Sequence, residues 1–74
     1  MLSLGEKILL LRTRHQPRLT QRQVAEEVAV HTQTINQLER GVIQDVQSQT
    51  VARLARLFGV STDYLLGLRD GDGP

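Results

Sequence analysis

The sequence predicts one compact all-α domain built from five short helices. Two observations lead to this fold class. Apolar residues recur at helical spacing in separate clusters along the 74 residues, and no run alternates apolar and polar residues as a strand would. Serine or threonine precedes most of these clusters and glycine or proline follows most of them, which are the start and stop signals of short helices.

The first helix is expected to begin after Ser3 and to end near Arg14 or His15. Ser3 and Glu6 occupy the N-cap and N3 positions of a capping box, in which each side chain accepts a hydrogen bond from the other residue's backbone. Pro17 cannot continue a helix, so residues 15–18 form a connection. The apolar face of this helix, at positions i, i+4 and i+7, consists of Leu4, Ile8 and Leu11.

The second helix has the clearest start in the chain. Thr20 and Gln23 form a second capping box, and Leu19 is placed to pack on Val24 as a hydrophobic staple. A turn is expected near Ala29, at a position that favours a residue tolerant of positive φ, such as glycine.

A third helix over about residues 32–40, ending before Gly41, would pair with the second as a helix-turn-helix. Small and apolar residues fall where two crossing helices need them, at Val24, Ala25, Val28, Ala29, Val30, Ile35 and Leu38. The side chains that remain outward are all polar, namely His31, Thr32, Gln33, Asn36 and Gln37. A short, amide-rich helix propped on a helix behind it suits the reading of base edges in the DNA major groove.

The last two helices follow a loop over residues 42–47. A fourth helix over residues 48–58 ends at Gly59, and Ser61 caps a short fifth helix that runs to about Leu66. The helix-turn-helix domain is therefore expected to cover residues 1–68. The glycine- and aspartate-rich tail, residues 69–74, is expected to be disordered.

Composition excludes several functional classes. No apolar stretch approaches the roughly 18 residues that a membrane helix needs, and the absence of cysteine excludes disulfides and thiolate metal sites. We expect no cofactor, no metal site, no membrane partner and no enzymatic activity, because no phosphate loop, nucleophile motif or metal-ligand spacing is present. The absence of cysteine also fits a protein of the reducing cytoplasm. Residues 1–40 hold six of the nine basic residues against four glutamates, which places net positive charge on the half with the two-helix motif.

Several motifs together resemble the lambda repressor–Cro superfamily of the Xre type. They are the Leu-Thr-Gln start of the second helix, the Ile-x-x-Leu-Glu-Arg-Gly end of the third, and the Leu-Ala-x-x-Phe-Gly-Val-Ser-x-Asp-x-Leu-Leu run from Leu54 to Leu66. The resemblance covers about residues 4–67. It implies a five-helix lambda-repressor-like fold and a sequence-specific regulator of transcription that binds double-stranded DNA. It also implies a homodimer acting as a repressor on a palindromic operator.

The resemblance also implies roles for individual residues. The base-contacting positions would be His31, Thr32, Gln33 and Gln37. Contacts to DNA phosphates would come from Gln21, Arg22, Asn36 and Arg40. Arg12 and Glu39 resemble the ion pair that joins the first helix to the end of the third. Apolar residues beyond the needs of a small core suggest a dimer interface at Val60, Tyr64, Leu65 and Leu68.

The sequence departs from the family pattern at two places, and two alternative functions stay open. The connection over residues 15–18 is about two residues longer than is common, and the loop over residues 42–47 has no proline or basic residue and contains Asp45. One alternative is the antitoxin of a toxin–antitoxin pair, in which the same domain also holds a toxin. The other is a protein-interaction module that has lost DNA binding. The sequence leaves a possible protein partner unidentified.

Overall fold

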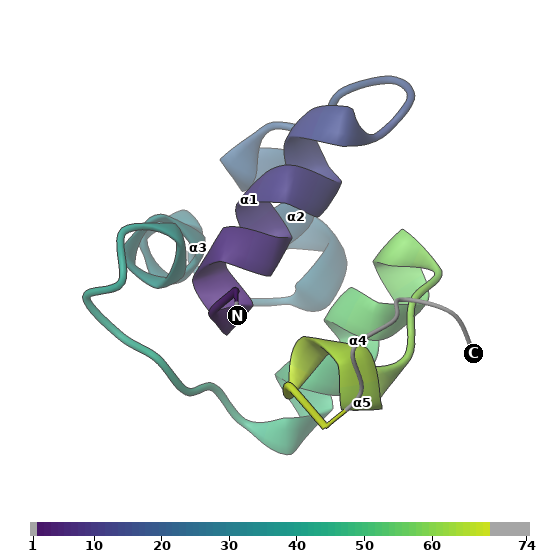
Figure 1. Ribbon diagram of the computed structural model, residues 1–74. Coiled ribbons are helices and arrows are strands. Elements are labelled where there is room, and N and C mark those ends of the chain that lie inside the picture. The colour runs from purple at the N-terminus through teal and green to yellow at the C-terminus, as the bar shows by residue number, and fades with distance from the viewer. Residues whose placement is uncertain (1, 69–74) are drawn as a thin grey trace.

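The computed structural model describes residues 2–68, and the tail predicted over residues 69–74 lies outside them. Within the described residues all regular structure is helical (Figure 1). The elements are α1 (Leu4–Arg14), α2 (Gln21–Val28), α3 (Thr32–Glu39), α4 (Ser48–Phe58) and α5 (Thr62–Leu65). The predicted all-α fold with five helices, of which the second and third form a helix-turn-helix, is confirmed.

Side-chain caps begin three of the helices where the sequence indicated. The Ser3 hydroxyl accepts from the Glu6 backbone N–H at 3.2 Å, and the Glu6 carboxylate accepts from the Ser3 N–H at 2.9 Å. This bond to Ser3 lowers the pKa of Glu6 below its usual value. Thr20 and Gln23 form the corresponding box at α2, with distances of 3.0 and 2.8 Å. Each box satisfies two backbone N–H groups that a helix start leaves without intrahelical partners.

The turn between α2 and α3 confirms the expected backbone conformation. Ala29 has φ 61° and ψ 45°, which is the left-handed region. Gly41, after α3, and Gly59, after α4, also have positive φ, at 76° and 67°. Among these three helix ends only Ala29 carries a Cβ, which crowds the following carbonyl in this conformation.

Ala29→Gly should therefore raise the free energy of unfolding by about 0.5–1 kcal/mol. Relief of the strain at positive φ, about 1–2 kcal/mol, exceeds the entropy that glycine adds to the unfolded chain, about 0.4–1 kcal/mol. Urea unfolding followed by circular dichroism measures the change. A lower midpoint for the glycine variant would contradict the strained turn.

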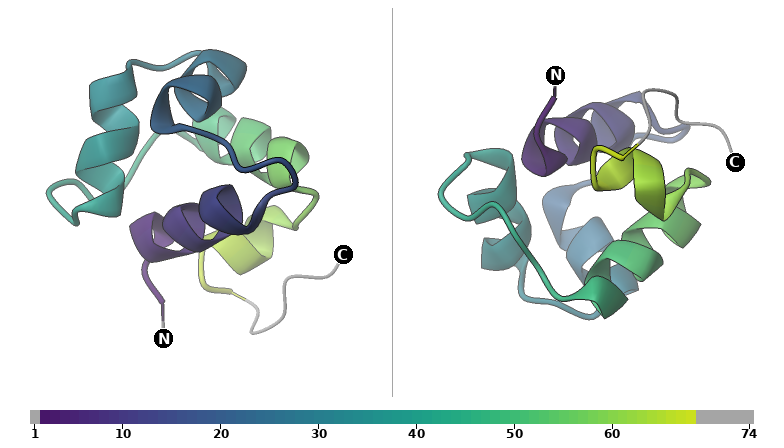
Figure 2. Two further views of the ribbon diagram at one scale, coloured as in Figure 1. Left: turned by 90° about the horizontal axis from the view of Figure 1, so that it is seen from above. Right: turned by 60° about the horizontal axis from the view of Figure 1, so that its bottom comes forward.

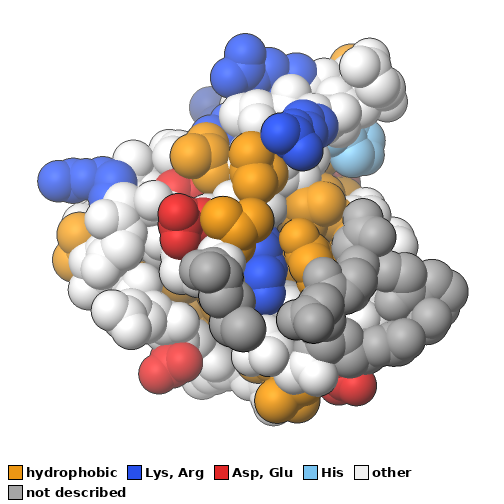
Figure 3. All heavy atoms as spheres, in the orientation of Figure 1, with side chains coloured by type: hydrophobic (Ala, Val, Ile, Leu, Met, Phe, Trp, Pro, Cys, Tyr) orange, Lys and Arg blue, Asp and Glu red, His pale blue; other side chains and the backbone are white. Residues whose placement is uncertain are grey.

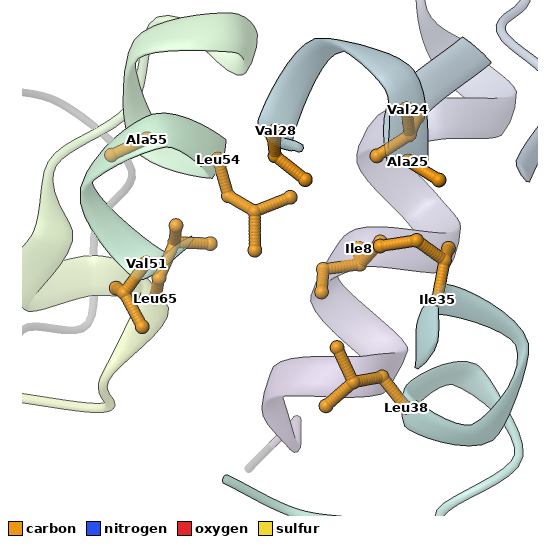
Figure 4. Close-up of a cluster of buried hydrophobic side chains, with 10 residues drawn as sticks. All are labelled: Ile8, Val24, Ala25, Val28, Ile35, Leu38, Val51, Leu54, Ala55 and Leu65. Carbon is orange, nitrogen blue, oxygen red and sulfur yellow. The ribbon is translucent and has the colours of Figure 1, made fainter. Parts of the chain in front are cut away.

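Ten buried side chains form one core that all five helices contribute to (Figure 4). α2 packs against α3 and α4, α1 packs against α3, and α4 packs against α5. Figure 4 shows Leu54 of α4 pointing toward Val28 of α2, while Ile8 of α1 lies beside Ile35 of α3. The core thus holds α3 against both α1 and α2, and the opposite face of α3 is left outside it.

Two buried residues of α1 have roles that sequence patterning did not indicate. A Cβ built on Gly5 would lie 1.7 Å from the carbonyl oxygen of Leu38, so α1 and α3 touch backbone to backbone at this point. Lys7 is only 4% exposed. Its Nζ donates to the backbone carbonyl of Tyr64 and lies 4.7 Å from the centroid of the Tyr64 ring, which joins α1 to α5.

One predicted interface residue is corrected by its burial. Leu65, expected to face a second copy of the chain, is 1% exposed and belongs to the core. The four-residue helix α5 places Leu65 inward against the core and leaves the next residue, Leu66, 55% exposed. Leu65 therefore cannot contribute to an interface without unfolding α5.

Candidate nucleic-acid interface

The exposed face of α3 is polar along its length. The buried residues Ile35 and Leu38 point from α3 into the core. His31, Thr32 and Gln33 are exposed at its start, and Gln37, one helical turn after Gln33, is half-buried. The left view of Figure 2 shows α3 at the outer edge of the molecule, beside α2. The four predicted base-contacting residues thus come from one accessible stretch of a single short helix.

The side chains Arg12, Gln21, Asn36 and Glu39 form one hydrogen-bonded network behind this face. The carboxylate of Glu39 accepts from Arg12 Nε at 2.7 Å and from Arg12 Nη2 at 2.8 Å, a two-pronged ion pair. It also accepts from Gln21 Nε2 at 2.9 Å. Gln21 Oε1 in turn accepts from Asn36 Nδ2 at 3.4 Å.

This network ties α1, the α1–α2 connection, α2 and α3 together. The hydrogen bond to Glu39 raises the pKa of Arg12, although burial acts in the opposite direction. Arg12 Nη1 also donates to the carbonyl of Leu19 at 3.1 Å, at the end of the longer connection. Arg12 and Glu39, paired in the sequence analysis only by resemblance, are thus within direct bonding distance.

The remaining basic residues near α3 lie on the surface. Arg22, in the first turn of α2, forms a loose pair with Glu26 at 3.5 Å, and both side chains are more than two-thirds exposed. Arg40 is exposed at the C-cap of α3. Because an exposed pair of this kind contributes little to stability, Arg22 can turn toward an external anion, and the exposed side chain of Arg40 is accessible to one as well.

The loop after α3 folds back onto the end of that helix. The backbone N–H groups of Val42 and Ile43 both donate to the carbonyl of Gln37, at 2.9 and 3.3 Å. Val42 is 59% exposed and Asp45 is exposed. This loop therefore exposes an apolar side chain directly after α3 and an acidic side chain further along, and none of its residues is basic.

Two classes of site are absent from the part of the chain that the structure describes. Residues 2–68 contain no group of three or more histidine, aspartate or glutamate side chains that could hold a metal ion. None of the helices within that range has the length and apolar character needed to span a bilayer.

Comparisons with known proteins agree with this geometry. A family model described as helix-turn-helix matches residues 10–65. The HTH-type transcriptional regulator ImmR of Bacillus subtilis (strain 168) is 35% identical over 66 residues, which are 89% of this chain and 50% of ImmR. The chain therefore spans about half the length of this curated relative.

A solved structure matches the fold as a whole. The P22 c2 repressor, crystallised in complex with synthetic operator 9T, superposes with a TM-score of 0.77 and is 26% identical in sequence. The match covers 89% of this chain and 96% of the repressor chain.

Proposed function

This chain belongs to the helix-turn-helix family, and from that premise we propose that it is a sequence-specific regulator of transcription that binds double-stranded DNA. Its family is one of DNA-binding regulators and not of enzymes. The observation that carries the proposal is the polar, accessible face of α3, held outward by a core on its opposite side. The names of the similar proteins, a transcriptional regulator and a repressor in complex with a synthetic operator, support the same assignment.

In the proposed complex α3 lies in the major groove and its amide side chains read base edges. Gln33 and Gln37 can each form a two-pronged contact with adenine, and Thr32 can touch a thymine methyl. His31, at the N-cap of α3 with no side-chain cap bond, is free to reach a base. Phosphate contacts come from Gln21, Arg22, Arg40 and the first backbone N–H groups of α2, which intrahelical bonds leave open.

The finer part of the proposal is a homodimer that represses transcription from a palindromic operator. Two copies would place their α3 helices about 34 Å apart, one helical turn of DNA. At the C-terminal end of the described residues, Leu66 and Leu68 are 55% and 71% exposed and offer apolar surface to a second copy. Val60 and Tyr64, the other two residues predicted for this interface, are half-buried. Figure 3 shows further hydrophobic side chains along α1 on the same side of the molecule.

Selection of bound fragments from a randomised duplex library tests this proposal directly. The purified protein at moderate salt should enrich a palindrome whose half-sites are about 10 base pairs apart. Binding should weaken steeply with added salt, because each phosphate contact releases a counterion. Absence of enrichment from a folded protein would favour the protein-interaction module, to which the exposed Asp45 in the loop after α3 is better suited.

Replacing Gln33 and Gln37 together by alanine should abolish most of the preference for the selected site. Each good two-pronged amide–adenine contact contributes about 1–3 kcal/mol of discrimination, so the ratio of specific to nonspecific affinity should fall at least about tenfold. Competition binding with specific and scrambled duplexes measures this ratio. Since neither side chain is buried, thermal unfolding should be nearly unchanged. If the double variant retains the full preference for the selected site, Gln33 and Gln37 of α3 do not read the bases.

A further inference from the structure

We infer that Asn36 is a positioning residue that acts on DNA through Gln21, instead of contacting a phosphate itself. The inference rests on the proposed function and deepens it. Asn36 is half-buried, and its amide nitrogen points at the side-chain oxygen of Gln21 at 3.4 Å. The family resemblance had implied that Asn36 itself contacts a DNA phosphate.

The order of donors and acceptors in the network fixes how the side-chain amides of Gln21 and Asn36 are oriented. The Glu39 carboxylate, 5% exposed, can only accept hydrogen bonds, and Arg12 already donates two to it. The group that Gln21 turns toward Glu39 must therefore be its NH2. In this orientation the side-chain oxygen of Gln21 faces Asn36. Because this oxygen accepts hydrogen bonds, Asn36 must turn its own NH2 toward it to donate one.

The consequence for binding lies at the start of α2. Gln21 is the first residue of α2, beside backbone N–H groups that have no intrahelical partner. Its NH2 group carries two hydrogens, of which Glu39 takes one, so the second remains as a donor for a phosphate oxygen. A bare oxygen at this place would repel the phosphate. By donating a hydrogen bond to the side-chain oxygen of Gln21, Asn36 keeps the Gln21 NH2 turned toward Glu39 and the phosphate.

A double-mutant cycle separates this role from direct contact with DNA. Affinity for the selected duplex is measured for the parent, Asn36→Ala, Gln21→Ala and the double variant. We expect Gln21→Ala to weaken binding about tenfold, as for one hydrogen bond to a charged group, and Asn36→Ala about threefold to tenfold. The double variant should bind no more weakly than Gln21→Ala alone.

Gln33 provides a matched control. Like Asn36 it lies on α3, but its side chain is exposed and makes no hydrogen bond to another side chain within residues 2–68. The losses of affinity in Gln33→Ala and Gln21→Ala should multiply in their double variant, because the two contacts are independent. If Asn36→Ala weakens the Gln21→Ala protein by the same factor as the parent, Asn36 contacts DNA itself. If Gln21→Ala has no effect on binding, Gln21 makes no contact. Either result overturns the inference.

The free protein supplies a second test that does not depend on DNA. The side-chain NH2 resonances of Gln21 should shift in Asn36→Ala and should not shift in Gln33→Ala. If Asn36→Ala does not fold, Asn36→Asp replaces it in this test. Aspartate keeps the shape of the side chain but removes its donor, so the Gln21 NH2 resonances should shift in this variant too. Unmoved Gln21 resonances would overturn the positioning role. A shift without any binding of the parent to DNA would instead contradict the proposed function and leave the network intact.

Discussion

Gly5→Ala should lower the free energy of unfolding by about 3 kcal/mol or more, at the upper end of what an added methyl group costs in a packed core. The new Cβ would lie 1.7 Å from the carbonyl oxygen and 2.5 Å from the carbonyl carbon of Leu38. These are backbone atoms, so no side chain can rotate away. Relief would require α1 to separate from α3, which Ile8 and the Arg12–Glu39 pair resist.

The effect is large relative to the stability of so short a chain. At about 0.05–0.15 kcal/mol per residue, the whole domain has roughly 4–11 kcal/mol to lose. Urea unfolding of the parent and the variant measures the difference. Gly59→Ala is the control, because its φ is 67° but nothing lies within 4 Å of the added Cβ. Its cost is strain of about 1–2 kcal/mol, offset by the lower entropy of the unfolded alanine chain, about 0.4–1 kcal/mol. Equal losses in the two variants would contradict the close contact between α1 and α3.

Arg12→Ala should be the second most damaging change, at about 3 kcal/mol. Removing one partner of a buried ion pair costs about 3–5 kcal/mol, because the other charge stays buried without compensation. Here Glu39 is 5% exposed and would keep only its bond from Gln21. The variant also loses the bond from Arg12 to the Leu19 carbonyl, which anchors the end of the α1–α2 connection. Unfolding in urea at constant pH measures the loss.

Two controls distinguish the buried pair from an ordinary surface charge. Arg22→Ala removes the exposed partner of Glu26 and should change stability by less than about 1 kcal/mol. Replacing both members together, as Arg12→Met with Glu39→Leu, should recover much of the loss because no unpaired charge remains. Equal effects of Arg12→Ala and Arg22→Ala would show that the pair contributes nothing beyond a surface contact.

The features that the sequence predicted correctly are local in origin. A capping box such as Thr20 with Gln23 depends on residues three positions apart, and the turn at Ala29 depends on backbone sterics at one residue. The inward placement of Ile35 and Leu38 follows from helical periodicity. For the same reason the polar face of α3, the centre of the candidate site, could be recognised before any tertiary contact was known.

The sequence by itself thus determined where each helix begins and ends and which face of α3 stays polar. Only the tertiary structure decided that Gly5 must lack a side chain, that Lys7 is buried against α5, that Leu65 belongs to the core and that Asn36 points at Gln21. Each of these depends on how closely two helices approach and at what angle. Periodicity along one helix carries no record of the distance to its neighbour, because that distance is set by the packing of all side chains between them.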